Sequence, residues 1–227
     1  MKGLLYYNLL LNKMWFLAAG IAAAVGTAVC FFLYKNDDHN VILILIFPLL
    51  QVIVAFICTE WLGRSFETDI KCRFADYILT SGISKKAYVL AELAKNIIST
   101  AIAYAMCIAM QLIMLFRGLG AFMPAFLLGF VLVVGVLRWI TSFVTIFLRS
   151  AEKAGLIVAI GFVLLTVIPY NVIVSIEPDA LAYFEYYLQE YSLKWIIHLL
   201  FYIVIVGAYA VVYALFFRRV RKGDVCR

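Results

Sequence analysis

Long apolar stretches separated by short polar segments fill most of the chain. A helix rises about 1.5 Å per residue, so about 20 apolar residues are needed to cross the roughly 30 Å hydrocarbon core of a bilayer. Six stretches meet this requirement, at about residues 14–34, 41–62, 93–116, 123–148, 154–174 and 195–217. The pattern predicts an all-α membrane protein in which residues 1–227 form a single domain of six transmembrane helices.

The composition supports a membrane location. Hydrophobic residues make up 67% of the 227 residues and charged residues 14%, against about 45–50% and about 25% in an ordinary soluble domain. Such a chain has too little polar surface to cover a soluble globule, so the apolar excess must face lipid. The net charge of +6 does not indicate a nucleic-acid partner, because membrane proteins concentrate Lys and Arg in their cytosolic loops.

Basic residues lie mostly on one side of the predicted spans. With both termini in the cytosol, 15 of the 19 Lys and Arg residues are cytosolic. Lys35, Arg117 and Lys194 then face outward, and Arg138 lies within the fourth span. The positive-inside bias therefore predicts cytosolic N and C termini. The first apolar run has no small-x-small cleavage site before Lys35, so we expect it to be retained as a span.

Motifs for enzymatic chemistry are missing from the sequence. There is no G-x-x-x-x-G-K-[ST] phosphate loop, no H-E-x-x-H and no G-x-S-x-G. We therefore expect no catalytic residues, no metal site and no cofactor in this chain, and energy must come from a partner or an ion gradient. The five cysteines lie in apolar runs or in basic cytosolic segments, so we expect no disulfide framework.

Two segments outside the spans are predicted to lie at the membrane surface. Residues 1–13 are apolar but interrupted by Lys and Asn, which predicts an interfacial helix, or else the start of a long tilted first span. Pro178 suits the first turn of a short outer helix between the fifth and sixth spans, where Phe184, Tyr187 and Tyr191 share one stripe. This outer helix is either a belt resting on the outer leaflet or part of a gate.

The cytosolic connection between the second and third spans runs from Gly63 to Glu92. From Asp69 to Ser81, apolar residues recur at helical spacing, which predicts a short amphipathic helix. Gly82 is a candidate C-cap and Ser84 a candidate N-cap of the helix that continues into the third span. The apolar stripe either rests among lipid headgroups or fits the groove of a cytosolic partner. Its members are Ile70, Phe74, Tyr77, Ile78 and Leu79.

The stretch RFADYILTSGISKKAYVLAELAKN in this connection resembles the loop after the second span in ABC-2 type permeases, the membrane subunits of ATP-driven exporters. In those proteins a short coupling helix leads into a turn of small residues and an Ile-Ser-basic-basic run. Here the run starts at Ile83, and Gly82 stands where proline is commoner. The six-span layout also agrees, and the size is similar to the half-permeases of phenol-soluble modulin exporters.

This resemblance implies a homodimer or heterodimer of six-helix subunits in a bacterial cytoplasmic membrane, exporting amphipathic peptides or other hydrophobic cargo. Each subunit would dock one ABC ATPase subunit, which binds ATP and Mg. The resemblance also implies which residues couple to that ATPase. They are Ile70, Phe74, Tyr77, Ile78, Leu79, Ser81, Gly82 and Ser84.

Charged residues inside the spans are few, and Arg138 stands out. It lies about 15 residues into the fourth span, near mid-bilayer, where a lone guanidinium costs at least about 2.5–3.5 kcal/mol. We expect it to face a wet cavity, a carbonyl cluster or a partner's acid, or else to snorkel toward the cytosol. Glu60 is expected to pair with Arg64, four residues later.

Two other functional classes remain open on the sequence alone. An ion-coupled carrier or channel is weakened by the scarcity of acids within the spans, because such carriers keep carboxylates or broken helices near the midplane. A membrane scaffold or immunity protein that transports nothing is the third possibility. Co-purification with an ATPase distinguishes the exporter from both.

Overall fold

Six α-helices and one π-helical turn make up the described part of the chain in this computed structural model, which describes residues 13–33, 40–71, 80, 82–116, 124–167 and 194–221. These ranges contain no β-strand, so the prediction of an all-helical chain is confirmed for them. The elements, in chain order, are α2 (Lys13–Leu33), α3 (Asn40–Lys71), α5 (Lys85–Phe116), α6 (Pro124–Leu148), α7 (Ala151–Phe162), η1 (Val163–Val167) and α10 (Lys194–Arg221).

Four helices are long and apolar enough to cross a membrane. Their apolar windows are Lys13–Phe32, Lys85–Met114, Val131–Leu148 and Leu199–Arg221. α3 contains a shorter apolar run, Leu49–Glu60, and only part of the predicted fifth span, up to Val167, is described. Four long apolar helices indicate a membrane-spanning protein. The second and fifth spans stay predictions.

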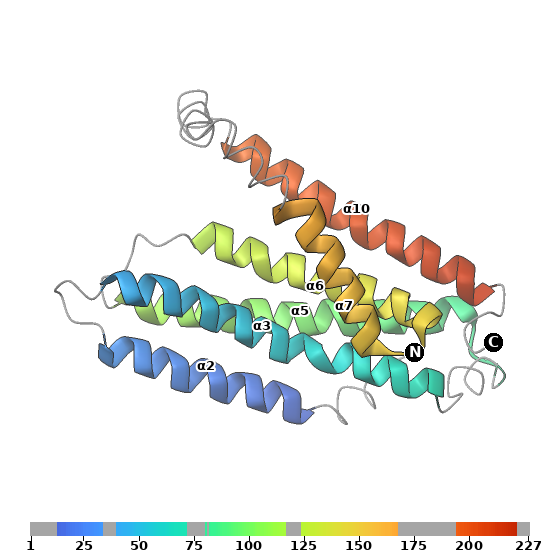
Figure 1. Cartoon of the computed structure of the whole chain (residues 1–227), viewed down its shortest axis with the longest axis horizontal. Coiled ribbons are helices and arrows are strands. Elements are labelled where there is room, and N and C mark those ends of the chain that lie inside the picture. The colour runs from blue at the N-terminus through green and yellow to red at the C-terminus, as the bar shows by residue number, and fades with distance from the viewer. Residues whose placement is uncertain are drawn as a thin grey trace.

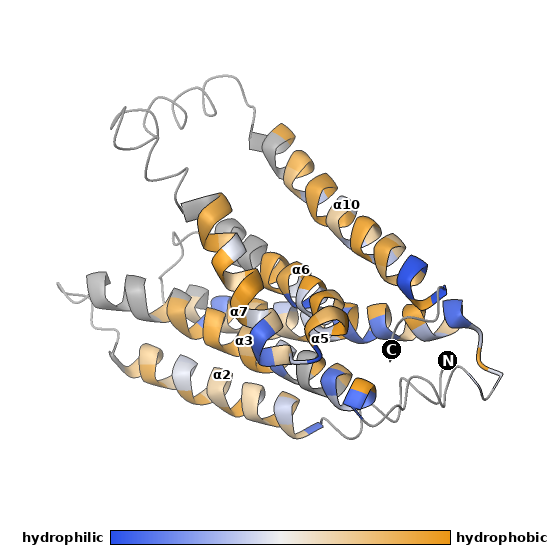
Figure 2. Ribbon diagram, turned by 45° about the vertical axis from the view of Figure 1, so that its right-hand side comes forward, coloured by the Kyte–Doolittle hydropathy of each residue, from blue (hydrophilic) through white to orange (hydrophobic). Residues whose placement is uncertain are grey.

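The helices form a bundle around α3, α5 and α6. α2 packs on α3, α3 packs on both α5 and α6, and α7 crosses α6 (Figure 1). α10 contacts α5 and α6, and among its described side chains the buried ones lie in its last three turns, at Val212, Phe216 and Val220. Its first half diverges from the bundle and exposes apolar side chains such as Leu199 and Ile203 (Figure 2).

Charged residues gather at one end of the bundle, where α3 ends and α5 begins (Figure 2). Between these helices and the end of α10 lies an apolar cluster that is almost fully buried. Phe216 is at its centre, with its ring 5.5 Å from that of Phe66 and 5.4 Å from that of Trp139, measured between centroids. The cluster consists of Phe66, Ile70, Tyr88, Val89, Trp139, Ile146, Val212, Phe216 and Val220.

α3 is longer than the sequence pattern predicted. It continues from Leu62, where the apolar run ends, to Lys71, so Asp69 and Ile70 belong to its last turn and do not begin a separate amphipathic helix. Ile70 is 5% exposed and packs in the cluster just described. This corrects the prediction that Ile70 is a docking residue, because its side chain is already buried within the chain.

The start of α5 agrees with its predicted cap. Ser84 Oγ accepts a hydrogen bond from the backbone N–H of Ala87 at 3.1 Å, and Ser84 O accepts one from Tyr88 N at 3.1 Å. Gly82 has φ +84°, a left-handed conformation that favours glycine and suits the predicted C-cap. Only residues 72–84 separate α3 from α5, which leaves a much shorter link than the predicted loop from Gly63 to Glu92.

Candidate functional site

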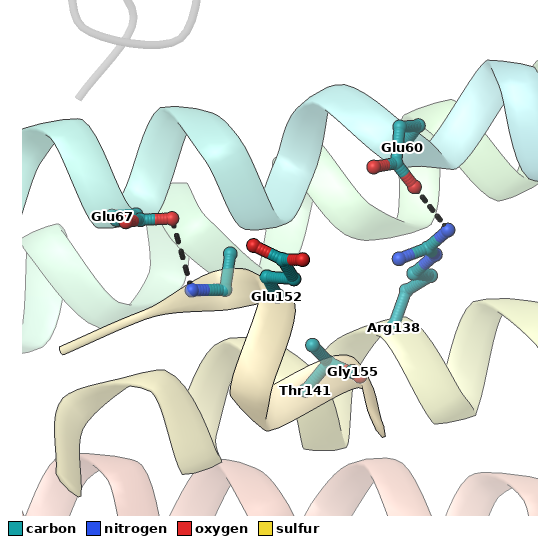
Figure 3. A pocket seen from close by; sticks show the side chains of 7 residues that line it. Glu60, Glu67, Arg138, Thr141, Glu152 and Gly155 are labelled. Atoms are coloured by element: carbon teal, nitrogen blue, oxygen red, sulfur yellow. Dashed lines mark hydrogen bonds and ion pairs between the residues drawn. The ribbon is translucent and has the colours of Figure 1, made fainter. Parts of the chain in front are cut away.

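A cavity of about 550 Å³ lies between α3, α6 and α7, near the charged end of the bundle (Figure 3). Three carboxylates and one guanidinium line it, so acidic groups outnumber basic groups by two. Each of the three helices contributes at least two residues. The lining consists of Glu60 and Glu67 from α3, Arg138 and Thr141 from α6, and Ala151, Glu152 and Gly155 from α7.

Arg138 forms an ion pair with Glu60 across one side of this cavity (Figure 3). Their side chains are 16% and 31% exposed, so water and lipid screen the pair only in part. The Arg138 guanidinium also lies over the ring of Phe56, with Cζ 5.3 Å from the ring centroid. Phe56 precedes Glu60 by one turn of α3. One face of α3 therefore supplies both the carboxylate that pairs with the Arg138 guanidinium and the aromatic ring that it lies over.

The register of α3 and α6 brings Arg138 beside an acid of the same chain. The residue lies beside Glu60, at the predicted cytosolic end of the second span, and about 21 Å along α6 from Pro124. The rest of α6 runs alongside the end of α3, where Ile146 shares the buried cluster with Ile70. Arg138 is therefore about midway along α6, and its depth in a membrane stays a prediction. The carboxylate of Glu60 contacts Arg138, whereas the Arg64 side chain lies outside the described residues, so the expected Glu60–Arg64 pair stays a prediction.

Glu67, two turns after Glu60 on α3, contacts the start of α7. Its Oε2 accepts a hydrogen bond from the backbone N–H of Ala151 at 2.9 Å, and its Oε1 pairs with Lys71. Ser150 is the N-cap of α7 and accepts a bond from Lys153 N at 3.4 Å. A carboxylate at this position satisfies a free N–H of the first helical turn and interacts favourably with the helix dipole.

A second group of charges is buried beside the cavity, where α3 and α5 pair. The Lys95 ammonium lies 2.7 Å from a Glu92 carboxylate oxygen, and the two side chains are only 1% and 5% exposed. Burial raises the pKa of the nearby Asp69 carboxyl from 3.8 to about 6, while Lys95 lowers it and Glu92 raises it further. These three residues form the charged interior of the α3–α5 pairing.

A polar contact also connects α10 to α5. The Tyr209 hydroxyl donates a hydrogen bond to Asn96 Oδ1 at 2.7 Å. At the same crossing Gly135 of α6 allows close approach, because a Cβ built there would lie 2.8 Å from the Tyr209 hydroxyl and 2.7 Å from Thr100 Cγ2. Polar side chains of α5 and α10 therefore meet where these two helices pack against α6.

Several residues of the predicted sites lie outside the described part of the chain, and the structure says nothing of them. In the docking segment these are Phe74, Tyr77, Ile78, Leu79 and Ser81, and in the predicted outer helix they are Phe184, Tyr187 and Tyr191. The predicted interfacial helix before Lys13 also lies outside it. Ser84, Gly82, Ile70 and Arg138 are described above.

Sequence reasoning did not find Glu67, Glu152 or the Lys95 group. A signal for Glu67 was present, because residues seven apart share a helix face and Glu67 follows Glu60 by seven. The apolar run ends near Leu62, however, so hydropathy alone does not indicate that the helix reaches Glu67. Lys95 and Glu92 also have helical spacing, but nothing in their neighbours indicated that they are buried.

Comparison with known proteins adds no relative. No family model matches the chain, and neither curated proteins nor solved structures show a significant similarity to it. Within the residues that the structure describes, no three His, Cys, Asp or Glu side chains are grouped so that they could hold a metal ion. Of the charged residues that line the cavity, Glu60, Glu67 and Arg138 join helices that are distant in sequence.

Proposed function

We propose that this chain is the membrane-spanning subunit of an ATP-driven exporter of the ABC-2 type, which moves amphipathic peptides or other hydrophobic cargo out of a bacterial cell. In this proposal the chain has six transmembrane helices with cytosolic termini and works as a homodimer or heterodimer. The segment 72–84 docks a separate ABC ATPase subunit that binds ATP and Mg.

The observation that carries the proposal is the common extension of α3 and α5 beyond their apolar runs. α3 continues nine residues past Leu62, which is about 13 Å, and α5 begins eight residues before Leu93, which is about 12 Å. The link between them therefore starts and ends well beyond the predicted membrane edge. At this distance from the predicted membrane edge, the apolar stripe of an amphipathic segment is more easily covered by a cytosolic protein than by lipid headgroups.

The extension is packed firmly enough to transmit force. Phe66 of α3 and Tyr88 of α5 lie beyond the predicted membrane boundaries and are fully buried with Phe216 of α10. We call the packed ends of α3, α5 and α10 the stem. At the end of the stem, Lys85 Nζ donates a hydrogen bond to the backbone carbonyl of Arg221 at 3.1 Å. A displacement of the docking segment would therefore move the ends of three helices together.

The cavity beside Arg138 supports transport more than scaffolding. It opens between α3, α6 and α7 close to the stem, so motion of the stem would change its shape. The ion-coupled alternative is weakened because Glu60 is paired with Arg138, and so is occupied in joining helices. The apolar side chains exposed on α7 and α10 suit lipid, a second subunit or hydrophobic cargo.

Docking is tested by purifying the chain together with candidate ABC ATPases. We expect the wild-type chain to retain an ATPase and the double variant Phe74→Ala, Tyr77→Ala to lose it, because buried aromatic anchors commonly contribute 2 kcal/mol or more, or about 30-fold in affinity each. The matched control is Arg73→Ala, Asp76→Ala, on the other faces of the same segment. Equal recovery of the ATPase with both double variants would contradict the docking assignment.

The rival classes predict other outcomes. An ion-coupled carrier purifies without an ATPase and drives uptake into liposomes when only an ion gradient is applied. A scaffold or immunity protein does neither.

A further inference from the structure

α7 packs along α6 but touches α3 at only a few places. Ala154 is its one buried residue among those described, while Leu156, Ile157 and Ile160 are all at least half exposed. On the side facing the cavity stands Gly155, where a Cβ would have nothing within 4 Å. Apolar packing therefore fixes α7 much less than it fixes α3, α5 or α6.

The link between α6 and α7 is a tight bend with one unfavourable residue. It consists of Arg149 and Ser150. Arg149 has φ +51°, in the left-handed region, which is unfavourable for a residue with a side chain. Ser150 is extended, with φ −147° and ψ 118°. A bend of this kind persists only while other contacts hold the two helices in place.

Glu67 supplies such a contact from outside the bend. Its Oε2 holds the Ala151 N–H, the first backbone donor of α7, and thereby connects α7 to α3 across one end of the cavity (Figure 3). Its other oxygen pairs with Lys71, which is 63% exposed and is the last residue of α3 before the docking segment. A single carboxylate therefore joins α7 to the part of α3 that a cytosolic partner would reach.

We propose that Glu67 is a latch that holds the start of α7 against the cytosolic end of α3, and that α7 turns about Arg149 and Ser150 when this contact breaks. Displacement of the end of α3 through Lys71 would release the Ala151 N–H and change the shape of the cavity. The use of this motion in transport rests on the proposed exporter function. The latch itself is a property of this chain and requires no ATPase.

The latch is tested by distance measurement on the chain alone in lipid nanodiscs. Spin labels are placed at Ile53→Cys on α3 and Ile157→Cys on α7, which are 44% and 52% exposed, after Cys72 and Cys226 are changed to Ser. The cysteines Cys30, Cys58 and Cys107 are buried and are expected to stay unlabelled. We expect one main distance with Glu67 intact. Glu67→Ala should raise the share of a second distance by about tenfold, as expected for loss of a charge-assisted hydrogen bond.

Two further variants separate the latch from a general loss of charge or of folding. Glu152→Ala removes another carboxylate from the same cavity and should leave the distances unchanged. Glu67→Gln keeps an acceptor oxygen, so it should fold and shift the distances in the same direction by a smaller amount. Unchanged distances in both Glu67 variants, or an equal change in Glu152→Ala, would overturn the latch. Because no ATPase is present, this result is independent of the docking experiment.

Discussion

At the scale of single residues, the few charges in this apolar chain connect helices to one another. Glu60 of α3 pairs with Arg138 of α6, and Glu67 of α3 holds the start of α7. The need for such partners follows from the high cost of an isolated charge in an apolar setting. Each pair also fixes the register of two helices, because a shift of one residue would turn the partners onto different faces.

The Glu60–Arg138 pair should depend on both partners. Arg138→Met leaves the Glu60 carboxylate without its guanidinium, so we expect a loss of about 2 kcal/mol, below the 3–5 kcal/mol of a fully buried pair because both side chains are partly exposed. Thermal unfolding in lipid or detergent measures this loss. The double variant Arg138→Met, Glu60→Leu should recover most of it, since neither charge is then stranded. If the double variant is no more stable than Arg138→Met, the two residues do not act as a pair.

Part of this chemistry could be predicted from the sequence. The sequence shows that Arg138 lies in an apolar run and must find polar partners. It does not show which ones, because Glu60 is 78 residues away and the choice depends on how α3 slides against α6. The local alternative, a Glu60–Arg64 pair, follows from helical spacing alone. Register between distant helices is set by side-chain packing, which spacing does not reveal.

At the scale of elements, the length of the apolar runs predicted where the long helices occur but not where α3 ends. The long apolar runs appear as α2, α5, α6 and α10. The extension of α3 to Lys71 was not predicted, because Phe66 lies among polar residues and is buried only where the ends of several helices meet. The start of α5 just after Ser84 was predicted from its cap. The connection predicted between the two spans, from Gly63 to Glu92, is therefore longer than the link of residues 72–84 that separates α3 from α5.

The crossing of α5, α6 and α10 should tolerate no side chain at Gly135. A Cβ there would meet both branches of Thr100 and the Tyr209 hydroxyl, and β-branched Thr100 has no rotamer that withdraws both. We expect Gly135→Ala to lower stability by about 1–3 kcal/mol, typical of overpacking. Gly207→Ala on α10 is the matched control, because nothing lies within 4 Å of its Cβ. Equal unfolding temperatures for the two variants would show that the crossing is looser than described.

Asp69 should make stability depend on pH in a defined direction. Burial raises the pKa of its carboxyl from 3.8 to about 6, so the folded chain binds the proton more tightly than the unfolded chain. The contribution of Asp69 to stability is then greatest below pH 4 and is lost as pH rises through about 6. We expect Asp69→Asn to raise the unfolding temperature at pH 7.5, and this advantage to shrink by pH 5. An advantage that grows on acidification would contradict the assigned direction.

At the scale of the whole molecule, the two ends of the bundle differ. At the charged end, α3, α5, α6 and α10 pack closely around Phe216. Toward the other end α10 diverges, and α7 and α10 expose apolar faces (Figures 1 and 2). This asymmetry suits a subunit that receives force at one end and changes its membrane-embedded surfaces in response. Composition and charge distribution predicted a membrane protein with a basic side, but the divergence of α10 depends on tertiary contacts that no local pattern indicates.

The central claim is that cargo in the membrane domain controls ATP hydrolysis through the docking segment. The most direct test is the rate of ATP hydrolysis in liposomes that contain this chain and its ATPase, with and without an amphipathic peptide. We expect peptide to raise hydrolysis with the wild-type chain and with Arg73→Ala, Asp76→Ala. It should have no effect with Phe74→Ala, Tyr77→Ala, because in the proposed function those two side chains anchor the ATPase. Full peptide-dependent hydrolysis in the Phe74, Tyr77 double variant would contradict the account.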